Sequence, residues 1–116
     1  MTTLRQATEA FVAVYHARPR LVADLADWSL RIELRIAGGG EAVAVRIDHG
    51  RVVAIEDPPG AGRADLVVTA AASVLLEVLA LRMSPNEPYL FGELLVDGPE
   101  AAFLRLDYLV TALCPE

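Results

Sequence analysis

The sequence predicts one α+β domain, built from a five-stranded, mostly antiparallel sheet with helices packed on it. Two observations carry this prediction. Strand-like segments follow one another through the middle of the chain without a helix between them, and helical apolar stripes occupy both ends and one later position. With 116 residues, the chain has the size of a single domain, which we expect to span residues 1–116. The expected order is helix, four strands, helix, strand and helix.

The N-terminal segment is predicted to be helical. Residues 3–17 repeat apolar side chains on one face of a helix, while Arg5, Gln6 and Glu9 lie elsewhere. Pro19 ends this pattern, because proline cannot continue a helix but can open a new one. A short second helical piece is therefore expected over residues 20–27.

The pattern then changes to a period of two. Residues 28–36 alternate five apolar with four polar side chains, which predicts a strand with one buried face, beginning at Trp28, and one solvent-exposed face. A glycine turn at 38–40 and a further alternation over 43–47 predict the second strand. Gly50, with His49 beside it, supplies the positive φ of a tight turn into a third strand, Arg51–Glu56. The three strands read as a meander.

A breaker-rich loop, residues 57–63, follows the meander. Residues 66–69 are the fourth predicted strand. Residues 70–82 are rich in helix formers, with Ser73 able to cap the helix. The apolar side chains of this helix cover more than one face, which predicts that it is largely buried.

The last part of the chain contains three further elements. Residues 84–88 are expected to start a short helical turn, and Leu90–Val96 is predicted as the last strand, closed by Asp97 and Gly98. Pro99 favours a helix start, and the apolar stripe that follows predicts a final helix up to Leu113.

Composition limits the classes of function. Hydrophobic residues make up 54% of the chain, so the surplus either lines a cavity or faces a partner. The net charge is −6 and all ten basic residues are scattered arginines, which argues against nucleic acid and anionic membrane surfaces as partners. No apolar stretch is long enough to span a membrane, so we expect no stable membrane insertion and a cytoplasmic protein.

Residues suited to catalysis or metal binding are few. Cys114 is the only cysteine and lies near the chain end, and His16 and His49 have no acidic or cysteine partner at metal-ligand spacing. The carboxylates fall mostly on predicted solvent-exposed faces, whereas acid–base catalysis needs a pair in a dry pocket. We therefore expect no catalytic residues, no metal, no cofactor and no enzymatic activity.

One motif near the C-terminus points to a family. A strand over residues 65–69 runs into a helix, and a turn at Pro85 leads to the aromatic residues Tyr89 and Phe91 and the segment Gly92–Gly98. This arrangement resembles the sterol carrier protein type 2 family, in which an aromatic residue, glycine, lysine and leucine precede a β-branched residue and a glycine. The layout of the N-terminal half is similar too. The chain departs from the pattern at Glu93, where the family usually has lysine, which puts direct extraction of lipid from a membrane in doubt.

The resemblance implies that an apolar molecule, such as a fatty acid, acyl chain or sterol-like lipid, binds between the sheet and the helices 70–82 and 99–113. The residues expected to line this site are Leu75, Val78, Leu79, Met83, Tyr89, Phe91, Phe103, Leu106 and Leu109. An alternative is a protein-interaction or dimerisation scaffold with the cavity filled. A homodimer would use the same apolar surface, so both interpretations stay open.

Overall fold

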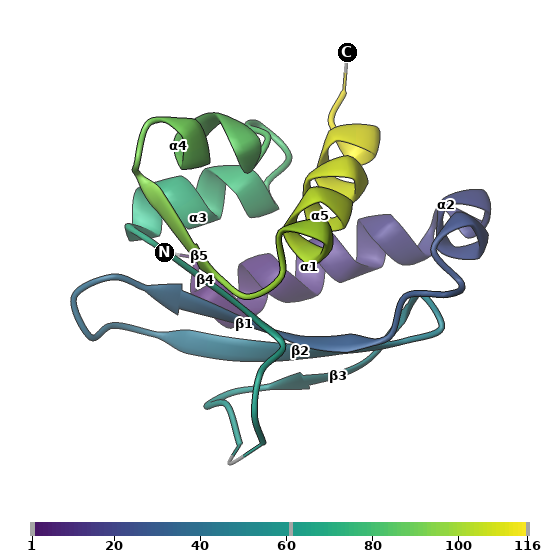
Figure 1. The fold of residues 1–116 in the computed structure, drawn as a ribbon, viewed down its shortest axis with the longest axis horizontal. Coiled ribbons are helices and arrows are strands. Elements are labelled where there is room, and N and C mark those ends of the chain that lie inside the picture. The colour runs from purple at the N-terminus through teal and green to yellow at the C-terminus, as the bar shows by residue number, and fades with distance from the viewer. Residues whose placement is uncertain (1, 61, 116) are drawn as a thin grey trace.

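A computed structural model describes residues 2–60 and 62–115, and it contains the expected sheet with helices on one face (Figure 1). The helices are α1 Leu4–His16, α2 Pro19–Asp24, α3 Ala72–Leu79, α4 Asn86–Leu90 and α5 Glu100–Leu113. The strands are β1 Leu30–Ile36, β2 Ala42–Asp48, β3 Arg51–Glu56, β4 Leu66–Ala70 and β5 Leu94–Asp97. The α+β prediction is confirmed.

The first helix begins at a capping box. The Thr3 side chain accepts a hydrogen bond from the Gln6 N–H, and the Gln6 side chain accepts one from the Thr3 N–H in return. The apolar stripe of α1 is buried against the sheet. The short second helix exists as predicted, but α2 begins at Pro19 and ends at Asp24, whereas the expected range was 20–27.

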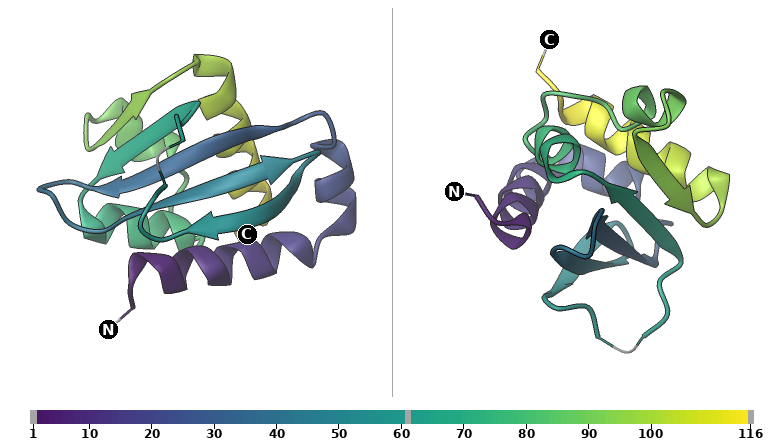
Figure 2. Two further views of the ribbon diagram at one scale, coloured as in Figure 1. Left: turned by 90° about the horizontal axis from the view of Figure 1, so that it is seen from below. Right: turned by 90° about the vertical axis from the view of Figure 1, so that its left-hand side faces the viewer.

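The sheet has the strand order β3-β2-β1-β4-β5, with β1 at its centre (Figure 2). Three neighbouring pairs are antiparallel, and β1 with β4 is the parallel pair. Leu34 lies opposite Val43 on one side and Val68 on the other, so the three apolar side chains form a row on one face. This row faces the helices.

The other face of β1 is not solvent-exposed, which corrects the expectation for Arg31 and Glu33. Both residues are buried, because the connection after β3 folds back over this face (Figure 1). The Arg31 guanidinium donates hydrogen bonds to the carbonyl oxygens of Gly60, at 3.2 Å, and Gly62. It also pairs with the Glu56 carboxylate at 3.0 Å. A charged residue can be buried there because its donors are satisfied.

The turn between β2 and β3 has the predicted backbone. His49 has a φ of 51° and Gly50 a φ of 82°. Trp28, predicted to be buried, is 6% exposed beside this turn, and its carbonyl accepts the Gly50 N–H at 2.9 Å. The strand itself begins two residues later, at Leu30.

Two predictions for the second half of the chain are wrong in detail. Helix α3 starts at Ala72 after the N-cap Ala71, so Ser73 lies inside its first turn and does not cap it. The segment predicted as the strand Leu90–Val96 divides instead into the end of α4 and a shorter β5. Gly92, with a φ of 76°, turns the chain between the two elements.

Candidate ligand cavity

An apolar cavity of about 50 Å³ lies between the sheet and the helices. Four lining residues come from α1: Thr8, Phe11, Val12 and Tyr15. The sheet contributes the floor, with Ile32, Leu34, Val45, Ile47, Val52, Val68 and Leu94. The remaining wall comes from Leu75, Val78 and Leu79 of α3, from Pro85, and from Leu106, Leu109 and Val110 of α5.

The two hydroxyl groups in this lining are satisfied within the protein. The Thr8 hydroxyl donates to the Leu4 carbonyl at 2.8 Å, and the Tyr15 hydroxyl donates to the Gly50 carbonyl. Burial raises the pKa of Tyr15, although Arg51 opposes the shift, so the phenol stays protonated. A cavity whose walls offer no free polar group stays dry.

The size of the cavity limits what it holds as it stands. A cavity needs about 10–15 Å³ to admit one water molecule, whereas pockets for small organic ligands typically measure about 300–1,000 Å³. The cavity of about 50 Å³ is thus a gap in a nearly filled core. A lipid chain fits only when the helices move away from the sheet.

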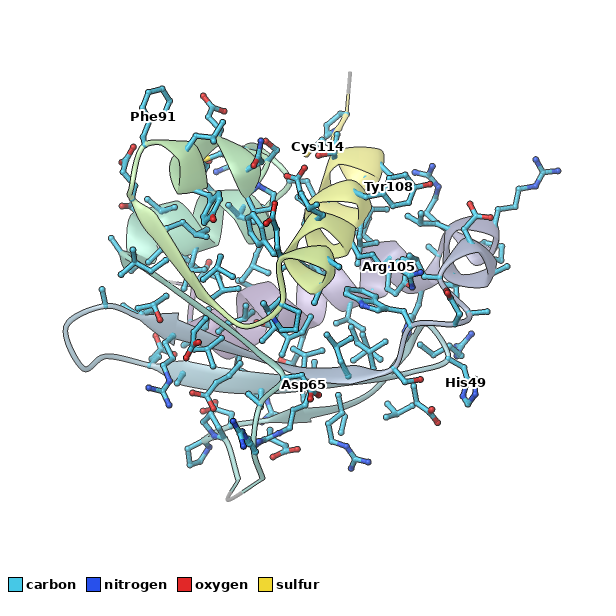
Figure 3. The ribbon with its side chains drawn as sticks, viewed as in Figure 1. His49, Asp65, Phe91, Arg105, Tyr108 and Cys114 are labelled. Atoms are coloured by element: carbon cyan, nitrogen blue, oxygen red, sulfur yellow. The ribbon has the colours of Figure 1, made fainter. Side chains whose placement is uncertain are left out.

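Two helices that cover the cavity, α1 and α5, are also held by polar contacts. Nε2 of His16 accepts a hydrogen bond from the Val52 N–H at 3.1 Å, which joins α1 to β3. In the middle of α5, the guanidinium of Arg105 (labelled in Figure 3) donates to both carboxylate oxygens of Asp27, at 2.9 and 2.8 Å. These hydrogen bonds lower the pKa of Asp27. These two polar contacts thus hold α1 and α5 in place around the apolar cavity.

The predicted site residues fall into two groups. The first group consists of cavity-lining residues: Leu75, Val78, Leu79, Leu106 and Leu109. The other four lie elsewhere. Met83 and Phe91 line a shallow pocket on the surface, and Phe91 points away from the fold at the end of α4 (Figure 3). The Tyr89 ring packs on the buried Phe103 ring, with 4.7 Å between centroids.

The residues of α1 and of the sheet that line the cavity were not among the predicted site residues. Phe11, Tyr15, Ile32 and Leu34 stood on predicted apolar faces, but periodicity shows only that a face is buried. The topology determines which buried faces meet across a gap. No signal in the sequence separates these residues from ordinary core.

Groups suited to other chemistry are sparse in the described part of the chain. Across residues 2–60 and 62–115, no three His, Cys, Asp or Glu side chains gather as a metal site. Burial, with a smaller contribution from Asp107, raises the pKa of the Cys114 thiol and so favours its protonated form. No helix in these ranges is long and apolar enough to cross a membrane.

Comparison with known proteins agrees with the fold and with the family resemblance. The sequence model of the SCP-2 sterol transfer family matches residues 9–110. No curated protein matches the chain in sequence. A crystal structure of sterol carrier protein 2 superposes with a TM-score of 0.70 at 20% identity, covering 93% of this chain and 90% of the other.

Two solution structures are also similar. One, a conserved hypothetical protein of Thermus thermophilus, has a TM-score of 0.67 at 19% identity and covers 95% of this chain and 87% of its own. The other is palmitated SCP2L2 of Aedes aegypti, with a TM-score of 0.62 at 14% identity and coverage of 89% and 93%. At these identities the structural similarity establishes the fold alone.

Proposed function

The chain belongs to the SCP-2 sterol transfer family, and from this premise we propose that it binds a fatty acid, acyl chain or sterol-like lipid in the cavity between its sheet and helices. The family and its fold imply lipid or sterol binding or transfer. The particular ligand class and its place in this chain are our proposal.

The apolar, enclosed lining of the cavity is the observation that carries the proposal. Its walls come from three helices and five strands, so an apolar chain lying there would be surrounded on all sides. Each methylene removed from water contributes about 0.8 kcal/mol. A longer acyl chain thus contributes more free energy toward separating α1, α3 and α5 from the sheet.

We propose that the protein acts by binding and not by catalysis. The cavity lining contains no carboxylate, histidine, cysteine or arginine. Its two hydroxyl groups are engaged with backbone carbonyls. A general base or nucleophile needs a partner within hydrogen-bond distance, and these side chains offer none inside the cavity.

The small volume of the cavity favours a second candidate, an interaction scaffold that keeps the fold with its interior filled. A gap of about 50 Å³ is close to what an ordinary core tolerates. In that case the wild-type protein would bind no fatty acid saturably. A titration of the wild-type protein with a fluorescent fatty acid therefore distinguishes the two functions.

The test compares two variants on one helix. Leu109 lines the cavity and Leu113, one turn later, is equally a buried leucine but lies outside the lining. Binding of the fluorescent fatty acid cis-parinaric acid is titrated for wild type, Leu109→Trp and Leu113→Trp. We expect Leu109→Trp to weaken binding by about tenfold or more, because the indole occupies ligand space.

The control variant should retain wild-type affinity. Overpacking at Leu113 is expected to cost about 1–3 kcal/mol of stability without affecting the ligand. Native circular dichroism is recorded for both variants to show that they fold. Equal weakening in both variants, or none in Leu109→Trp, would contradict the proposed cavity.

A further inference from the structure

The segment from α4 to β5 has an exposed apolar surface. Eight large hydrophobic side chains are exposed in the described part of the chain, and four of them lie within residues 89–95. These are Tyr89, Leu90, Phe91 and Leu95, with exposed fractions of 41%, 72%, 75% and 63%. Clustered apolar side chains on a surface mark sites of interaction.

The same region is acidic. Residues 83–104 contain four carboxylates, Glu87, Glu93, Asp97 and Glu100, and no basic residue. Within the described ranges, none of the four forms a salt bridge. The flanking arginines do not compensate them, since Arg82 pairs with Glu77 and Arg105 with Asp27.

Strand β5 is an edge strand. It pairs with β4 on one side, and the sheet order places no strand on the other. The backbone N–H and C=O groups of an edge are a template for a further strand. Leu94 is buried beneath the sheet, whereas Leu95 and Asp97 are exposed on the opposite face.

A pocket of about 150 Å³ lies at the start of this edge. Val74, Met83 and Pro88 give it apolar walls, and Phe91 adds an aromatic ring. Glu87 and Glu93 also line it. An arginine or lysine side chain suits such a pocket, because its apolar stem and its charged end need different surroundings.

We propose that this α4–β5 surface binds an extended segment of a partner protein in which basic side chains stand two residues before and two residues after an apolar one, and that the segment adds a strand to the sheet along β5. An apolar side chain of the segment lies against Leu95. Basic side chains lie against Asp97 and in the pocket between Glu87 and Glu93. Strand addition gives affinity through the backbone, and the alternate side chains give specificity.

Charge argues against two other occupants. An anionic membrane surface would be repelled by the four carboxylates. A second copy pairing antiparallel through β5, centred on Leu95, would place Glu93 opposite Asp97 at both ends. Like charges directly opposite each other destabilise a strand pair. A basic partner meets neither obstacle.

The probe is a short peptide of the pattern Arg-Ser-Val-Ser-Arg, whose arginines and valine lie on one face of an extended strand, and its counterpart has glutamate in place of both arginines. Binding is followed by fluorescence anisotropy at low salt, and hydrogen exchange reports on the amides of β5. We expect the basic peptide to bind and to slow exchange at β5, while the acidic peptide does not bind. The double variant Glu93→Arg with Asp97→Arg should weaken basic-peptide binding by about tenfold or more and favour the acidic peptide.

The matched control is Glu9→Arg with Asp24→Arg, which changes the net charge equally at two exposed residues of α1 and α2. It should retain basic-peptide binding. Equal loss in both double variants, no protection at β5, attachment to phosphatidylglycerol vesicles or self-association through β5 would each overturn the proposal. Leu109→Trp leaves this surface unchanged, so peptide binding by that variant is independent of whether lipid binding is found.

Discussion

Nε2 of His16 accepts a hydrogen bond from the backbone N–H of Val52 at 3.1 Å, so the last turn of α1 is fixed to β3 through an unprotonated ring nitrogen. Burial lowers the pKa of this imidazole, and the guanidinium of Arg51 lowers it further. Tyr15, the preceding residue, holds the same helix end to Gly50. Both Tyr15 and Val52 line the cavity.

This relationship predicts that stability falls in mild acid. The unfolded chain binds a proton at His16 near pH 6.5, whereas the folded chain binds it only at a lower pH. The contribution of His16 to the free energy of unfolding is therefore fully present above about pH 6.5. It decreases as the pH falls toward the lowered pKa of the folded state, and it is lost below that pKa. Urea unfolding between pH 5 and 8 measures this slope, which should be smaller in His16→Gln. A His49→Gln variant, which changes the other histidine, should keep the contribution of His16. An unchanged slope in His16→Gln would contradict the assignment.

The Tyr15 hydroxyl should contribute measurably to stability. Tyr15→Phe leaves the buried Gly50 carbonyl without the phenol donor, and an unsatisfied buried acceptor costs about 1–3 kcal/mol. Chemical unfolding gives the value directly. Tyr108→Phe removes a hydroxyl from an exposed tyrosine on α5 and should stay within about 0.5 kcal/mol of wild type. Similar effects for the two variants would show that the Tyr15 contact adds nothing.

A comparison of two glycines separates two costs of an added Cβ: the cost of a positive φ and the cost of a steric clash. Gly39 has a φ of 79° with open space around an added Cβ, while Gly50 has a φ of 82° and its Cβ would lie 2.7 Å from the carbonyl oxygens of Val22 and Leu25. Positive φ alone costs about 1–2 kcal/mol for alanine. Gly50→Ala should cost about 1–3 kcal/mol more than Gly39→Ala, because α2 must shift. Equal melting temperatures for the two variants would show that α2 does not press on the turn.

Arg31 should protect the loop of residues 57–63, which covers the outer face of the sheet, from proteolytic cleavage. Its side chain binds Gly60, Gly62 and Glu56, and its backbone N–H donates to the Asp65 carboxylate at 2.9 Å. In Arg31→Ala the loop loses its side-chain anchor, so we expect faster tryptic cleavage after the exposed Arg63. Arg20→Ala, which removes an exposed arginine of α2, serves as the control. Equal cleavage rates would mean that the loop is held by other contacts.

The sequence predicts most of the sheet, because alternation is a local property. The five predicted strands exist, and β3 has the predicted limits. The burial of Arg31 and Glu33 could not be predicted, since it depends on a loop that returns more than twenty residues later. Leu90 was assigned to a strand because a short apolar run does not distinguish strand from helix. Here the backbone reverses at Gly92 and separates the two.

The candidate site was predicted in part for a related reason. The helical phase placed Leu75, Val78 and Leu109 on the inner faces of α3 and α5, and these faces border the cavity. Met83 and Phe91 have equally apolar side chains, but the turn at Leu81, with a φ of 63°, changes the direction of the chain after α3. From there the helical phase no longer indicates which side faces inward.

The parallel pairing of β1 with β4 has a consequence for the order of folding. Ile32 pairs with Leu66, while β1, β2 and β3 are joined by short turns. Closing a long loop costs entropy before its contacts form, so the meander is expected to assemble first and β4, with the helices after it, to dock later. Substitutions at Ala44 should slow refolding, whereas those at Leu94 should mainly speed unfolding. The cavity then comes into existence only in the final step, when the C-terminal half closes over a sheet that is already half built.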